Sequence, residues 1–214
     1  MEKSIESIWK EGFLAKDALV APFVNDLYNQ KSEHIIEKFK RMFRINLKAV
    51  VVGAILGLIG FPLMKMPITG VGLAIVLVVI VVVNKRLLNT LGQVDKCQNS
   101  FEYLKAFDSW MKFQISLNAK MAKWYYPVIF LSVALGIWFS PHSTKIFEQV
   151  PAHIPLGPLF SGVPLFMLIP LIVITFVLWI YGDRIYHWDL NVVYGRVLKK
   201  LTEILSDMEE LRAE

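Results

Sequence analysis

The sequence predicts an all-α protein that crosses a membrane four times. Two uncharged runs of 16 residues, 49–64 and 68–83, are separated by only three residues. Two further apolar stretches, 124–140 and 159–181, follow them. Charged residues are 19% of the chain, fewer than the roughly 25% of an ordinary soluble domain, and they are crowded outside these stretches. The predicted fold is a polytopic membrane protein with two antiparallel transmembrane hairpins, and its polar segments form a cytoplasmic helical bundle.

Residues 1–46 are predicted to form cytoplasmic amphipathic helices. Pro22 separates two of them, because proline is tolerated in a first helical turn but not in a helix interior. Apolar side chains recur at steps of three and four in each, as one buried helix face requires. They are Ile5, Ile8, Trp9 and Phe13 in the first helix, and Ile35, Ile36, Phe39, Met42 and Phe43 in the second. The second helix has no helix-breaking residue before the first membrane span, so we expect this helix and the span to be continuous.

A basic cluster lies beside that second apolar stripe. Its members are Lys38, Lys40, Arg41, Arg44 and Lys48. One interpretation is binding to anionic lipid headgroups, at about 1 kcal/mol for each basic residue near the surface. The other is that the cluster is the orientation signal of a cytoplasmic flank.

Residues 47–83 are predicted to form the first transmembrane hairpin. Pro62 and Pro67 bracket a turn too short for anything but the bend between two helices. Small residues are spaced four apart in both spans, and this pattern lets helix backbones approach closely in lipid. They are Gly53 and Gly57 in the first span and Gly70 and Ala74 in the second. They are expected to pack the two helices together, with a homodimer contact as the alternative.

Residues 84–123 are predicted to form a cytoplasmic helical segment. Its apolar stripe consists of Phe101, Leu104, Phe107, Met111 and Ile115. Cys97 is the only cysteine of the chain, so neither an internal disulfide nor a cysteine-based metal cluster is possible.

Residues 124–181 are predicted to form the second transmembrane hairpin, with a short proline-rich external loop. The third span opens with three aromatic residues typical of a headgroup boundary, and Pro127 is expected in its first turn. Ser132 and Gly136 give this span its own small-residue face. In the fourth span, Pro164 and Pro170 predict a kink near Phe166 unless the helix begins later.

Residues 182–214 are predicted to form a cytoplasmic amphipathic helix. Its apolar positions repeat for about three heptads, as an interface seam does. They are Leu190, Val193, Val197, Leu201, Ile204, Met208 and Leu211. Such a seam needs a partner helix.

The distribution of basic residues predicts the orientation. Of 23 Lys and Arg, only Lys65 and Lys145 fall on the side of the membrane away from the termini. The positive-inside rule therefore places the N-terminus, the central segment and the C-terminus in the cytoplasm of a cell-membrane protein.

The function expected from these features is that of a membrane-anchored interaction or regulatory protein. Its cytoplasmic helices would bind a soluble partner or a second copy, and anti-sigma-like sequestration is one concrete form. The side chains that could contact a partner are Trp9, Phe13, Trp110, Trp188, Val197 and Ile204. Aromatic residues often dominate interface energies, but the same residues could instead form the core of the bundle.

Other function classes find less support. A small homo-oligomeric channel is the alternative, with Thr69, Ser132 and Thr175 as the polar residues available within the spans. A transporter is disfavoured because no span has Asp, Glu, Arg or His at its centre. The sequence contains no phosphate loop, nucleophile elbow or zinc helix. We therefore expect no enzyme, and a lipid-modifying enzyme is among the classes this disfavours. No cofactor or metal is expected either. No basic stripe beyond the cluster suggests nucleic-acid binding.

Overall fold

The computed structural model describes residues 20–91, 100–141, 143, 158–160 and 163–213. Four long helices make up nearly all of this part of the chain: α2 (Val20–Leu63), α3 (Pro67–Leu91), α4 (Ser100–Trp138) and α6 (Leu168–Ala213). A two-residue antiparallel pair, β1 (Leu159–Phe160) and β2 (Val163–Pro164), and the 3-10 turn η1 (Leu165–Met167) precede α6. The prediction of an all-helical chain is confirmed for these residues.

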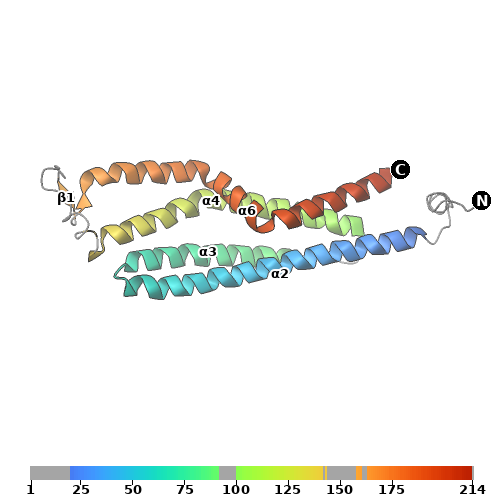
Figure 1. Cartoon of the computed structure of the whole chain (residues 1–214), viewed down its shortest axis with the longest axis horizontal. Helices are drawn as coiled ribbons and strands as arrows, with labels where there is room; N and C mark the ends of the chain where they lie inside the picture. Colours follow the sequence, from blue (N-terminus) through green and yellow to red (C-terminus); the bar gives the residue numbers. More distant parts are fainter. Residues whose placement is uncertain (1–19, 92–99, 142, 144–157, 161–162, 214) are drawn as a thin grey trace, which may run out of the picture.

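Successive helices run antiparallel along the long axis of the molecule (Figure 1). Each helix packs against the next, α2 on α3, α3 on α4 and α4 on α6, whereas α2 and α6 touch less extensively. The α2–α3 turn lies at one end, together with β1 and the start of α6, and the described beginning of α2 and end of α6 lie at the other (Figure 1).

All four helices are long and apolar enough to cross a membrane. We call the part of each helix near the α2–α3 turn its apolar half: 49–63, 67–83, 124–138 and 168–181. On α6 this half is exposed around its circumference, with Ile172 63%, Val173 55% and Phe176 58% exposed. Apolar surface of this extent is unusual on soluble monomers. The arrangement is consistent with a multi-pass membrane protein.

The remainder of the four helices, their polar halves, shares one hydrophobic core, which we call the bundle core. Its buried members come from all four helices: Ile35, Ile36, Phe39, Phe43, Leu91, Phe101, Tyr103, Leu104, Phe107, Met111, Tyr194, Val197, Leu201 and Met208. The apolar stripes that the sequence predicts on the residues of α2, α4 and α6 therefore meet inside the chain. In particular, the seam on the last helix finds its partner helices in α2 and α4 of the same molecule.

The turn between α2 and α3 closes the first hairpin. The N–H of Met66 donates to the carbonyl of Phe61 at 2.9 Å and that of Lys65 to the carbonyl of Pro62 at 2.9 Å, the pattern of a Schellman motif. Lys65 has the left-handed φ of 61° that this motif requires at its C′ position. Pro67 then begins α3, where its missing N–H leaves no hydrogen bond unmade.

Small residues mark the closest approaches between the helices. A Cβ at Gly70 would lie 3.0 Å from the carbonyl oxygen of Gly57, at the α2–α3 contact. A Cβ at Gly136 would overlap the side chain of Thr69, at the α3–α4 contact. One at Gly53, by contrast, would meet nothing within 4 Å.

Two further contacts of this kind were not predicted. A Cβ at Gly72 would overlap the side chain of Ser132, which brings Ser132 into the same α3–α4 contact. A Cβ at Gly182 would lie 2.9 Å from the carbonyl oxygen of Ala122, where α6 crosses α4. Ala74 is half-buried on α3.

Two expectations about proline need correction or refinement. Pro127 is not in a first turn, because α4 is continuous from Ser100 to Trp138 and carries it in its interior. Because proline has no N–H, the carbonyl of Lys123 lacks the hydrogen-bond donor that it would normally have in a helix. Gly182 packs against this turn of α4. Of the two readings of the fourth span, the later start applies: Pro164 precedes η1 and Pro170 lies in the first turn of α6.

We expect Gly136→Ala to destabilise the protein, because the added methyl group has no room beside Thr69. Overpacking of this kind costs about 1–3 kcal/mol. Thermal unfolding in uncharged detergent should show a lower midpoint for this variant. Gly53→Ala is the matched control and should leave the midpoint unchanged or raise it. Equal effects of the two substitutions would contradict the packing described here.

Candidate functional site

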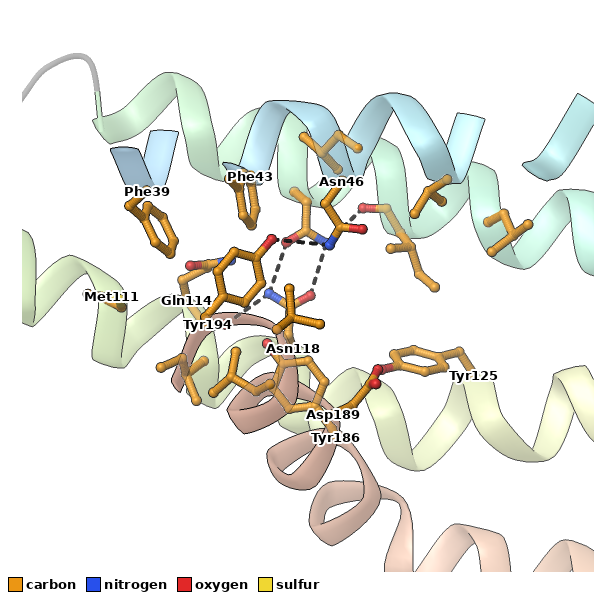
Figure 2. Close-up of a pocket in the computed structure, with 18 of the residues that line it drawn as sticks. Phe39, Phe43, Asn46, Met111, Gln114, Asn118, Tyr125, Tyr186, Asp189 and Tyr194 are labelled. Atoms are coloured by element: carbon orange, nitrogen blue, oxygen red, sulfur yellow. Dashed lines mark hydrogen bonds between the residues drawn. The ribbon is translucent and has the colours of Figure 1, made fainter. Parts of the chain in front are cut away.

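A cavity of about 280 Å³ lies where the apolar and polar halves meet. All four helices line it (Figure 2). In chain order the lining residues are Phe39, Phe43, Asn46, Leu47, Val50, Leu77, Ile80, Asn84, Met111, Gln114, Ile115, Asn118, Tyr125, Tyr126, Ile129, Tyr186, Asp189, Leu190, Val193, Tyr194 and Leu198. The charged residues that border the apolar runs are Lys48, Lys85, Lys123 and Asp183. The cavity is therefore at the level of that boundary.

Two buried asparagines form the floor of the cavity. The side-chain amide of Asn84 donates to the carbonyl oxygen of Asn118 at 2.9 Å, and that of Asn118 donates back at 3.1 Å. Each amide also donates to a backbone carbonyl of its own helix, Ile80 or Gln114, at 2.9 Å. All four N–H groups are thus used, and only carbonyl lone pairs remain for a ligand.

A second polar contact closes the side of the cavity toward the bundle core. The amide of Asn46 on α2 donates to the phenol oxygen of Tyr194 on α6 at 3.1 Å (Figure 2). The ring of Tyr194 is 5.4 Å from that of Phe39 and 6.4 Å from that of Phe43, between ring centroids. Tyr194 therefore belongs both to the cavity wall and to the bundle core.

Three further tyrosines and one carboxylate complete the polar lining. The rings of Tyr125 and Tyr126 are 4.6 Å apart between centroids. The carboxylate of Asp189 lies beside Tyr125 and Tyr186 (Figure 2). It interacts electrostatically with the hydroxyl groups of both and with that of Tyr126. Among the described residues that line the cavity, Asp189 is the only one with a charged side chain.

The mouth of the cavity lies between α2 and α6. The lining residues on α3 and α4 that carry amides, Asn84, Gln114 and Asn118, are buried. The exposed lining residues are instead Asn46 on α2 and Asp189 and Val193 on α6. A molecule would therefore enter from the side where these two helices face each other and reach the asparagine pair at the back.

The candidate partner contacts fall into two groups. Trp110 packs on Phe107 with 6.0 Å between ring centroids, and its indole N–H donates to the hydroxyl of Thr90 at 3.1 Å. Val197 is buried in the bundle core and Ile204 packs against it. Trp188 is 70% exposed. Trp9, Phe13 and Cys97 lie outside the described residues.

The basic cluster forms a charged surface on α2. Lys38, Arg41, Arg44 and Lys48 are exposed, and Lys40 is half-buried. A shallow hollow runs along Lys38 to Arg44 together with His34 and Glu37. All of its lining comes from one helix, so it offers positive charge to a flat surface and no enclosed site.

Sequence reasoning missed the cavity residues. Asn46 and Asn84 stand at the ends of apolar runs, where an amide is a visible exception, and this signal could have found them. Asp189 follows the fourth span among other charged residues, where a carboxylate is no exception. Within the described part of the chain, no three His, Cys, Asp or Glu side chains gather as a metal site requires.

Comparison with protein-family models, curated proteins and solved structures finds no match to this chain.

We expect Asn84→Leu to cost about 1–3 kcal/mol, because it leaves the amide of Asn118 buried without its partner. Replacing both residues by leucine should recover most of that loss, since removing both partners of a hydrogen bond can be nearly neutral. Unfolding free energies of the two single variants and the double variant give the coupling energy. Additive losses would show that the pair is not the bonded unit described here.

Proposed function

We propose that this chain is a membrane-anchored regulatory protein that binds an amphiphile in the junction cavity. Occupancy would alter the packing of α2 against α6 and so the surface that the polar halves present to a protein partner or a second copy. The observation that carries the proposal is the shared position of Tyr194, which lines the cavity and is buried in the bundle core.

The proposed orientation places the polar halves in the cytoplasm of the cell. Twenty-one of the 23 Lys and Arg residues lie in or beside these halves or in the segments that join them. The positive-inside rule assigns such segments to the cytoplasmic side. The mouth of the cavity would then face the inner lipid leaflet at headgroup depth, where amphiphiles are concentrated.

Coupling between the cavity and the bundle would run through α2 and α6. These helices touch less extensively than neighbouring helices do, and the Asn46–Tyr194 hydrogen bond is one of the contacts between them. A ligand that competes for the Tyr194 hydroxyl would weaken this bond and favour a different separation of the helices. A ligand shifts such an equilibrium only by its difference in affinity for the two arrangements.

The proposed partner surface is the exposed face of α6 beyond the apolar half. Trp188 and Val192, one turn apart, are 70% and 69% exposed. A large exposed tryptophan is a typical interface anchor. Val197 and Ile204 would contribute only if α6 moved away from the bundle core. Anti-sigma-like sequestration remains one form that this proposal can take.

A homo-oligomeric channel is the second candidate function, and the positions of the polar residues within the spans disfavour it. Thr69 is fully buried and donates to the backbone carbonyl of Ser132 at 3.1 Å. The hydroxyl of Ser132 donates to its own helix at 2.7 Å. Of the three polar side chains, only Thr175 lies outside this α3–α4 contact, so little remains to line a pore. We propose no transport and no catalysis.

We expect Val193→Trp to reduce amphiphile binding at least tenfold, because the indole covers the cavity mouth. The probes are three photoreactive amphiphiles that share one dodecyl chain and differ in head group: amine, alcohol or carboxylate. Saturable crosslinks to cavity-lining peptides are quantified by mass spectrometry. Val192→Trp is the matched control, since Val192 does not line the cavity. Saturable labelling of lining peptides that is identical in the two variants would contradict entry through this mouth.

The orientation yields a second prediction. With Cys97→Ser as background, Lys65→Cys should react with a membrane-impermeant maleimide added outside intact cells. Glu210→Cys, near the end of α6, should react only after the membrane is opened. The reverse pattern would invert the proposed topology, and equal labelling of both sites before opening would argue against a spanning chain.

A further inference from the structure

We infer that the head group taken by the junction cavity is a protonated primary amine on an apolar chain. This inference rests on the proposed function and specifies its ligand. It comes from three properties of the cavity: its charge, the hydrogen-bonding capacity of its polar groups, and its size and position.

The charge of the lining favours a cation. Asp189 is its only charged side chain among the described residues. Lys123, one of the bases that border the apolar runs, is paired with Asp183, with 3.4 Å between the ammonium and the carboxylate oxygen. Lys48 and Lys85 border the apolar runs but do not line the cavity. A ligand ammonium would therefore meet one carboxylate and no competing cation on the wall.

The polar groups of the lining favour a hydrogen-bond donor. Asn84 and Asn118 have no N–H group left, as shown above, and each offers a carbonyl lone pair. The four tyrosine hydroxyl groups can each accept a hydrogen bond as well as donate one. A primary ammonium has three N–H donors and no acceptor, so it complements the carbonyl oxygens of the asparagine pair and the carboxylate of Asp189.

The tyrosine rings add a second attraction for a cation. Aromatic faces attract an ammonium group within about 6 Å of the ring centroid. Tyr125 and Tyr186 lie at the same end of the cavity as Asp189 (Figure 2), and the ring of Tyr126 is 4.6 Å from that of Tyr125 between centroids. Aromatic rings and one carboxylate together are suited to an amine. A carboxylate head group would instead be repelled by the carboxylate of Asp189 and by the carbonyl oxygens of the asparagine pair.

The size of the cavity fits a head group and not a whole lipid. At a liquid volume of about 30 Å³ for each water-sized group, 280 Å³ holds roughly nine such groups. An ammonium with about eight methylene groups fills that space. The rest of the chain would leave through the mouth between α2 and α6, past Val193.

The test uses the dodecyl photoprobes described above on the full-length protein in uncharged detergent. We expect the amine probe to label the lining peptides at concentrations at least tenfold lower than the alcohol or carboxylate probe. Asp189→Asn should reduce labelling by the amine at least tenfold. Asp207→Asn, the same change at an exposed position of the same helix away from the cavity, should leave it unchanged.

Competition separates two sources of the amine. In lipid nanodiscs, phosphatidylethanolamine that displaces the amine probe better than phosphatidylcholine would identify a membrane phospholipid as the source. Displacement by free dodecylamine alone would identify a soluble alkylamine. Either result supports the inferred head group.

The failures of the two proposals are distinguishable. Saturable labelling by all three probes at similar concentrations, unaffected by Asp189→Asn, would overturn the amine and leave the binding function standing. The absence of saturable labelling by any probe would overturn both. An unchanged thermal unfolding midpoint for Asp189→Asn shows that lost labelling is not lost folding. If that variant unfolds, Tyr186→Phe, which removes one acceptor, should still weaken labelling by the amine more than labelling by the alcohol.

Discussion

The apolar halves of α2 and α6 constrain the rest of the structure, because they expose large aliphatic and aromatic side chains in nearly every direction. Lipid solvates such surfaces as well as protein does, so hydrophobic burial contributes little to helix association there. Close backbone contact and hydrogen bonds take over that role. Gly70 against Gly57, Gly136 against Thr69 and the hydroxyl of Thr69 on the backbone of Ser132 are the contacts of this kind.

In the polar halves, by contrast, burial of apolar side chains holds the helices together. Fourteen buried side chains from four helices form the bundle core, in which Phe43 stacks on the ring of Phe39 and Phe107 meets it edge-on. At the level where the two halves meet, neither close backbone contact nor the hydrophobic core holds the helices together fully. At this level α6 crosses α4 at Gly182 and changes direction (Figure 1). The cavity lies at that level, and its polar groups bond to one another or face the space a ligand would fill.

Much of the architecture follows from periodicity. Long uncharged runs predict spans, and apolar steps of three and four predict which faces meet, as with Leu201 and Phe107. Periodicity does not predict whether a small residue faces another helix. Spacing alone does not distinguish Gly53, which faces open space, from Gly136, which is enclosed by Thr69. Nor does sequence reveal the Asn84–Asn118 pair, whose members are 34 residues apart and on different helices. Pro127 was misplaced because interior proline is rare in helices of soluble proteins, whereas membrane helices tolerate it.

The account depends most on lipid surrounding the apolar halves up to the level of the cavity and no further. A nitroxide scan along α6 in reconstituted bilayers tests this directly, by comparing collision with oxygen, which concentrates in lipid, and with a water-soluble nickel chelate. The account predicts oxygen-dominated relaxation at Ile172, Phe176 and Ile180, a crossover between Tyr181 and Trp188, and nickel-dominated relaxation at Lys199 and Glu203. Nickel access throughout, or a profile without a crossover, would contradict it.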